Sequence, residues 1–154
     1  MEEVTFRIAD DEAVQYIVDH LREADRAEVE ALGLSKVEAV VDSYKESDYC
    51  YVAFEDEDTP ILLFGITFRG MRGHGYVWAL GTDGCDRHPV SMVRYGRLFM
   101  DHFLSVCPIL VNWCDARYSK ALKWLRMIGF AIDRPKPYGV KGALFCKITA
   151  KRRV

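Results

Sequence analysis

The segment Pro108 to Phe130, PILVNWCDARYSKALKWLRMIGF, contains the pattern that decides the fold. Its first part, Ile109–Trp113, is short, apolar and rich in β-forming side chains, which predicts a strand. After a polar break at Cys114–Ala116, apolar residues recur three and four positions apart and predict one buried face of a helix: Ala121, Trp124, Leu125 and Ile128. Gly129 suits a left-handed helix cap, and Phe130 re-enters a strand. A strand, a helix and a second strand in this order predict a helix packed on a sheet.

This layout resembles the C-terminal half of the GCN5-related N-acetyltransferase (GNAT) superfamily. In that family a strand is followed by a helix that ends in Gly-Phe and covers one side of the acyl-CoA site. Ile128-Gly129-Phe130 matches the pattern directly. Two family positions differ, because the usual Asn at the helix start falls on Tyr118 and the usual tyrosine acid falls on Leu125. The resemblance therefore supports the fold more directly than the chemistry.

The rest of the chain predicts elements that complete the family's order. Asp10 is a suitable helix N-cap, and Ser35 with Glu38 forms a capping box. A helical pattern over residues 21–32 stops at Gly33. We expect strands at 4–8, 49–54, 61–68, 76–80, 109–113 and 143–148, three helical pieces between the first two strands, and a long helix over 89–105. The order β-α-α-β-β-β-α-β-α-β-β predicts a single α/β GNAT-like domain over residues 1–154, with a mixed, mostly antiparallel sheet and helices on both faces.

Two polar loops, residues 55–60 and 69–75, predict that the strands at 49–54, 61–68 and 76–80 are consecutive antiparallel neighbours. The resemblance implies a different relation between the strands at 76–80 and 109–113. These should form a parallel pair that splays apart, so that the pantetheine arm of acyl-CoA can pair with the backbone of the first.

Composition narrows the classes of function. The formal charge of −2 over 154 residues gives no field that favours nucleic acid, and the basic end Lys151–Arg153 is expected to be a solvated terminus. The apolar runs are shorter than the ~20 residues of a membrane-spanning helix. Five cysteines without a CxxC pair and an acidic start without a signal peptide predict reduced thiols and a cytoplasmic location.

A second, narrower resemblance lies in the segment Leu21–Val29, LREADRAEV. It is similar to the start of small GNAT-like proteins of tailed phages, including the small internal virion protein of short-tailed phages. This resemblance implies virion proteins as partners and a location in the virion or the host cytoplasm.

The GNAT resemblance also implies a set of residues for acetyl-CoA. Leu80, Gly81 and Thr82 would give backbone contacts at the end of a strand. The family signature Gln/Arg-x-x-Gly-x-Gly/Ala falls on Ser91–Gly96, which puts the pyrophosphate beside Arg94, Tyr95, Gly96 and Arg97. Because Arg94 replaces a glycine, the alternative is a surface helix with two solvated arginines.

This sequence lacks the base and the acid that the family commonly uses, so other residues are the candidates for these roles. His74 is the candidate base, with an idle, exposed loop histidine as the alternative, and Tyr138 is the candidate acid. Cys85-x-x-His88 is one loose pair of metal ligands, so we expect no metal site. The charged residues of the segment from Asp25 to Glu28 are expected to form a solvated helix surface.

Two hypotheses of function follow. The first is an acyl-CoA-dependent N-acetyltransferase that transfers an acetyl group to an amine, with acetyl-CoA as co-substrate. The alternative is a catalytically silent GNAT-fold phage protein that acts in virion assembly or as an interaction module.

Overall fold

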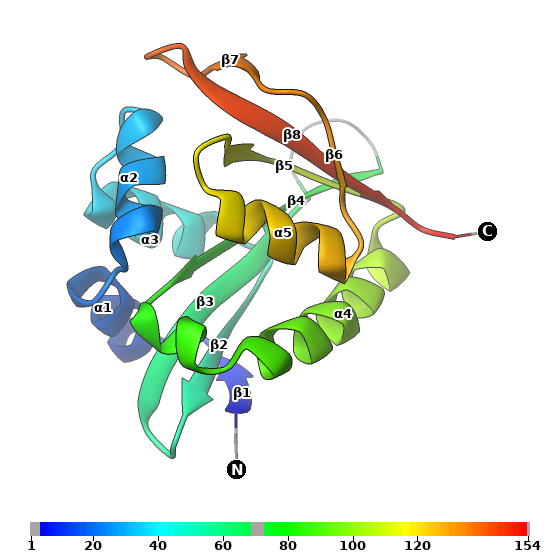
Figure 1. Ribbon diagram of the computed structural model, residues 1–154. Coiled ribbons are helices and arrows are strands. Elements are labelled where there is room, and N and C mark those ends of the chain that lie inside the picture. The colour runs from blue at the N-terminus through cyan, green and yellow to red at the C-terminus, as the bar shows by residue number, and fades with distance from the viewer. Residues whose placement is uncertain (1–3, 69–72, 154) are drawn as a thin grey trace.

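The computed structural model describes residues 4–68 and 73–153 of the chain. In this part, the strands form one eight-stranded sheet in the order β1-β2-β3-β4-β5-β8-β6, with β7 also paired to β8 (Figure 1). The strands are β1 (Val4–Ile8), β2 (Tyr49–Glu55), β3 (Thr59–Thr67), β4 (His74–Gly81), β5 (Ile109–Asp115), β6 (Ala131–Ile132), β7 (Lys136–Tyr138) and β8 (Ala143–Lys151).

The pairing of the central strands confirms the predicted sheet. The strands β2, β3 and β4 are consecutive antiparallel neighbours. Strand β4 pairs with β5 in parallel, and only over the three residues from His74 to Tyr76. Residues 69–72 of the predicted second loop lie outside the described residues.

Helices cover both faces of the sheet, as predicted. On one face lie α1 (Asp11–Asp19), α2 (Glu23–Ala31) and α3 (Lys36–Glu46), and on the other lie α4 (Pro89–Val106) and α5 (Ser119–Ile128) (Figure 1). Each layer closes its own apolar core, one around Ile17, Val40 and Leu63 and the other around Phe103 and Leu110. Among the described residues, no helix is long and apolar enough to cross a bilayer.

Local structure differs from the prediction at three places. The helical pattern over 21–32 begins only at Glu23, because Arg22 is extended and donates its backbone N–H to the carbonyl of Gly81. A short strand, β7, forms in the predicted loop before β8. The basic end is not simply solvated, because Lys151 pairs in β8 and the Arg152 guanidinium donates to carbonyls at the end of α4.

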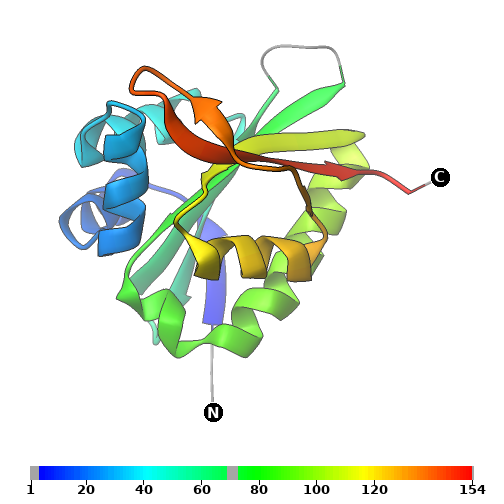
Figure 2. The same cartoon turned by 45° about the horizontal axis from the view of Figure 1, so that its top comes forward.

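The helix α5 ends as the sequence predicts, with Gly129 in the left-handed conformation at φ 118°. Figure 2 shows α5 (yellow) beside α4 (green). Gly96 of α4 allows this approach, because a Cβ atom there would lie 2.8 Å from Cγ2 of Ile128. Leu125, which the helical pattern places on the buried face, is partly buried against the same core.

We expect Gly96→Ala to destabilise the protein, although alanine normally stabilises a helix by about 1 kcal/mol relative to glycine. Overpacking against Ile128 costs about 1–3 kcal/mol and should exceed that gain. Urea unfolding of Gly96→Ala measures the loss. In an Ile128→Ala background, which makes room for the methyl group, the same change should be neutral or stabilising. Equal losses in both backgrounds would contradict this packing.

Candidate functional site

The candidate site is the gap that opens where β4 and β5 separate. The last paired residues are Tyr76 on β4 and Val111 on β5, after which the strands diverge toward Gly81 and Asp115. At the point of divergence the side-chain amide of Asn112 donates to the carbonyl of Val77. The two strands therefore form a V that is closed at its apex by one side chain of β5.

Strand β4 turns the backbone groups of alternate residues toward this gap. The N–H of Thr82 donates to the carbonyl of Ile61 on β3, at 2.9 Å. Because the hydrogen-bonding direction alternates along an antiparallel strand, Val77, Ala79 and Gly81 point their N–H and C=O groups away from β3 and toward β5. These are the groups that an extended ligand lying between the strands would have to pair with.

The helix α2 spans the open end of the V and bonds both strands. The Asp25 carboxylate accepts from the N–H of Gly81 at 2.7 Å, and the Arg22 N–H donates to the Gly81 carbonyl at 2.9 Å. Three residues after Asp25, the Glu28 carboxylate accepts from the N–H of Asp115 at 2.9 Å. Residues three apart share a helix face, so one face of α2 binds the ends of both strands.

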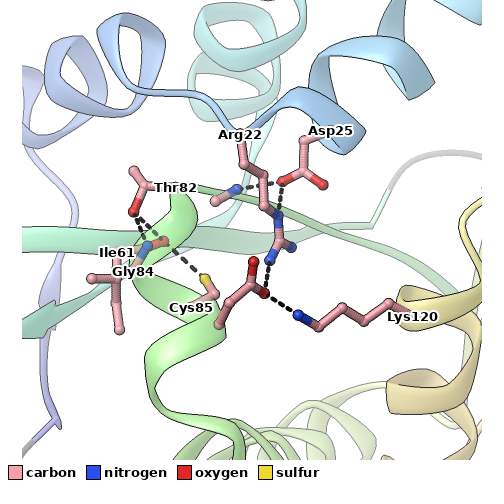
Figure 3. Close-up of polar contacts among 9 residues, drawn as sticks. Arg22, Asp25, Ile61, Thr82, Gly84, Cys85 and Lys120 are labelled. Atoms are coloured by element: carbon pink, nitrogen blue, oxygen red, sulfur yellow. Dashed lines mark hydrogen bonds and ion pairs between the residues drawn. The ribbon is translucent and has the colours of Figure 1, made fainter.

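Arg22 and Asp25 also form a buried ion pair (Figure 3). Nε of Arg22 lies 3.0 Å from the Asp25 carboxylate, and Asp25 is only 2% exposed. Burial opposes the charged guanidinium, but the Asp25 carboxylate outweighs it and the pKa of Arg22 is raised. The Arg22 guanidinium also lies over the ring of Tyr118, just before α5, at 5.7 Å from the ring centroid. The prediction of a solvated helix surface at Asp25 is therefore wrong.

A second ion pair crosses the gap between α2 and α5. Asp86, in the 3-10 helix η1 (Asp83–Arg87) that follows β4, lies 3.4 Å from Arg22 and 2.9 Å from Nζ of Lys120. Figure 3 shows Arg22, just before α2, and Lys120 of α5 pointing toward the same carboxylate. The pair with the exposed Lys120 contributes ~1 kcal/mol or less.

Near the gap, the Glu28 carboxyl has a pKa that is raised into the neutral range. Burial is the main cause that raises its pKa to about 7, and the nearby Asp25 and Asp115 carboxylates act in the same direction. The Cys114 thiol donates to the carbonyl of Asp115, and burial raises the pKa of Cys114, which keeps the sulfur protonated. Glu28 is thus a group that can exchange a proton near neutral pH.

Of the three residues predicted to bind the pantetheine arm, only Gly81 faces the gap. The side chain of Leu80 is buried against α1 and α3. Thr82 bonds β3 through its N–H and caps η1, because its hydroxyl accepts from the N–H of Gly84 at 3.0 Å. The Cys85 thiol, which donates to the carbonyl of Ile61 at 3.0 Å, packs the same turn against β3 (Figure 3).

The residues predicted for the pyrophosphate lie inside α4 rather than at its start. The first bond of the helix joins the N–H of Met92 to the carbonyl of His88, so the N–H groups of Arg94–Arg97 belong to the regular helical ladder. Tyr95 packs on Phe6 with ring centroids 4.9 Å apart. Gly96 contacts α5, and Nε of Arg97 donates to the carbonyl of Met127 at 3.0 Å.

One predicted catalytic residue, His74, lies away from the open end of this gap. His74 is the first residue of β4, at the paired end of the V, and seven steps along the strand separate it from Gly81 by about 23 Å. Tyr138 lies on β7 and stacks on Trp113, with ring centroids 4.2 Å apart. The structure does not bring His74 and Tyr138 together, nor either of them to Gly81.

Comparison with known proteins identifies the fold. No protein-family model matches the sequence, and no curated protein does. Among solved structures, AAC(6')-Ib in complex with ribostamycin and coenzyme A superposes with a TM-score of 0.72 at 12% identity, covering 97% of this chain and 94% of that one. The ribosomal-protein-S5-alanine acetyltransferase of Vibrio fischeri gives 0.66 at 14% identity, with 98% and 94% covered. An acetyltransferase of the GNAT family from Streptococcus pneumoniae gives 0.63 at 12% identity, with 97% and 100% covered. The fold is that of the GNAT acetyltransferases.

Three backbone groups that a ligand in the gap of this GNAT fold would pair with are already bonded within the chain. Both backbone groups of Gly81 are bonded to α2, and the carbonyl of Val77 is bonded to Asn112. In the segment matched to the phosphate-binding signature, the N–H groups from Met92 to Gly96 belong to the helical ladder and are not available to an anion. A ligand could pair with Gly81 only if α2 moved away from β4.

No sequence pattern predicted that Arg22, Asp25 and Glu28 would lie at the gap. One signal was present, because the segment Glu23–Ala31 has no apolar stripe and Val29 is its one large apolar side chain. A helix of this composition cannot be held by apolar packing alone, so polar contacts had to anchor it. Their partners, Gly81 and Asp115, lie 56 and 87 residues further along the chain.

We expect Asp25→Ala to lower the free energy of unfolding by about 3–5 kcal/mol, because it leaves a buried guanidinium and the Gly81 N–H without their acceptor. Asp25→Asn keeps an acceptor and should lose less. Glu23→Ala on the same helix removes an exposed ion pair with Arg26 and is the matched control, expected within ~1 kcal/mol of the parent. Urea unfolding compares the three. Similar midpoints for Asp25→Ala and Glu23→Ala would contradict the anchoring role of Asp25.

Glu28 should make stability fall as the pH rises. Its folded pKa of about 7 exceeds the ordinary 4.5, so between these values the folded state holds a proton that the unfolded state has lost. The stability that this proton gives is complete below pH 4.5 and is lost as the pH rises through 7. We expect the melting temperature of Glu28→Gln, relative to the parent, to increase from pH 5 to pH 8. The exposed Glu12→Gln is the control, and parallel curves for Glu28→Gln and the parent would contradict the assignment.

Proposed function

We propose that this chain is a catalytically silent GNAT-fold protein that works as an interaction module. One observation carries the proposal: α2 of the same chain is bonded to both backbone groups of Gly81, at the end of the splayed strand β4. The helical phosphate segment, the arginine at position 94 and the leucine at position 125 support it, because each departs from the family pattern.

We further propose that the module belongs to a phage and acts in virion assembly. The support is the segment Leu21–Val29, which resembles the start of GNAT-like phage proteins and supplies Arg22, Asp25 and Glu28 to the filled gap. The resemblance and the filling of the gap therefore concern the same residues. Mass spectrometry of purified virions tests this part, and absence of the chain from the particles would refute it.

Acetyl-CoA should not bind. A ligand at about 100 times its dissociation constant stabilises a protein by about 2.7 kcal/mol, which a thermal shift detects readily. We expect no shift with acetyl-CoA for this chain, and a clear shift for an active acetyltransferase of the same fold measured in parallel. Saturable stabilisation of this chain by acetyl-CoA would overturn the proposal.

The second candidate is an acyl-CoA-dependent N-acetyltransferase, and one observation favours it. Glu28, at the gap, has a carboxyl pKa of about 7 and is better placed to accept a proton near neutral pH than His74 or Tyr138. This function requires α2 to release Gly81. Release of free CoA thiol with a panel of amines tests it, and release that persists in Glu28→Gln would exclude Glu28 from the chemistry.

A further inference from the structure

The charges of this chain are divided between its two halves. Residues 1–86 contain 20 Asp or Glu and 7 Lys or Arg, whereas residues 87–154 contain 3 and 14. The first part therefore has a formal charge of −13 and the second a charge of +11, although the whole chain has only −2. A charge asymmetry of this size predicts electrostatic interactions with partners, which the small net charge of the whole chain would not predict.

The fold places the two kinds of charge on opposite faces of the sheet. The helices α1, α2 and α3 carry 10 acidic and 3 basic residues, and the helices α4 and α5 on the other face carry 1 acidic and 5 basic residues. Figure 1 shows the two groups of helices on different sides of the strands. The molecule therefore has an acidic face, α1–α3, and a basic face, α4–α5.

Exposed side chains make up both faces. The basic face includes the exposed side chains of Arg94, Arg97, Lys123 and Arg126. The acidic face includes Glu12, Asp19, Glu38 and Asp42, also exposed. Each face also exposes apolar side chains that could be buried in an interface: Val90 (69%) and Leu98 (57%) on the basic face and Val37 (51%) on the acidic face.

We propose that the basic face of one molecule docks on the acidic face of a second copy of this chain. Charge complementarity is the argument: the two faces have opposite sign, and their parts of the chain have nearly equal excess charge. A nucleic acid would account for the basic face alone, whereas a second copy accounts for both faces. Because the contact joins different surfaces on opposite sides of the molecule, copies add head to tail into a ring or an open chain. The proposal does not depend on whether the gap between β4 and β5 binds acyl-CoA.

Sedimentation velocity at two salt concentrations tests the proposal. Electrostatic attraction reaches ~30 Å at about 0.01 M salt and ~3 Å at about 1 M. We expect species larger than the monomer at low salt, increasing with protein concentration, and monomer at high salt. A monomer at low salt over the whole concentration range would overturn the proposal. So would binding to duplex DNA by a chain that remains monomeric without it.

Charge-reversal variants test the contribution of each face separately. The basic-face variant carries Arg94→Glu and Lys123→Glu, and the acidic-face variant carries Glu12→Lys and Asp42→Lys. Each variant alone should be monomeric at low salt, because every molecule lacks the same face. Mixed together, they should associate again, because each variant supplies the face that is altered in the other. Association of either variant alone at the level of the parent would overturn the head-to-tail arrangement.

A matched control keeps the test specific to these faces. Arg134→Glu with Lys136→Glu makes the same change in charge on exposed residues in and next to β7, outside the helices of both faces. This control should associate as the parent does. Circular dichroism and melting temperature establish that each variant is folded, so that loss of association reports on the interface. Equal loss of association in the control and in the basic-face variant would show net charge rather than a docking face, and would overturn the proposal.

Discussion

The contact between α2 and Gly81 is the constraint on which the rest of the site depends. Strand β4 separates from β5 after three paired residues. The buried backbone N–H and C=O groups at its end, at Gly81, therefore need other hydrogen-bond partners. In this chain Asp25 and the N–H of Arg22 provide them. The position of α2, the break before it at Arg22 and the filling of the gap all follow from this one requirement.

The buried pair of Arg22 and Asp25 specifies position more than it adds stability. Taking two charges out of water costs free energy that their attraction repays only with good geometry and further hydrogen bonds. Here the Gly81 N–H supplies such a bond to the carboxylate, and the ring of Tyr118 lies beside the guanidinium. The same set of contacts joins α2, β4 and α5, three elements that come together only in the folded chain, so it selects one arrangement of the two helical layers.

The fold of this protein does not by itself give its chemistry. The GNAT fold is shared with acetyltransferases at 12–14% identity, and a fold alone does not define an activity. The activity depends instead on the site. There the backbone groups of Gly81 are bonded within the chain, and the segment matched to the phosphate-binding signature is regular helix. The exposed charges named for the acidic and basic faces lie on helices whose inner sides close the two cores.

Local sequence determined the elements of this protein. Three local signals act within a few residues and predicted their helices correctly. The capping box at Ser35 marks the start of α3, the apolar spacing from Ala121 to Ile128 predicts α5, and the cap at Gly129 marks the end of α5. The splayed parallel pair was predicted through resemblance to a family rather than through any local rule. Tertiary structure alone decided what fills the gap. Arg22 and Asp25 find Gly81 across more than fifty residues, and His74 lies at the far end of the same strand. Hydrogen bonds over such separations depend on how the layers pack, and no periodicity within the α2 segment encodes them.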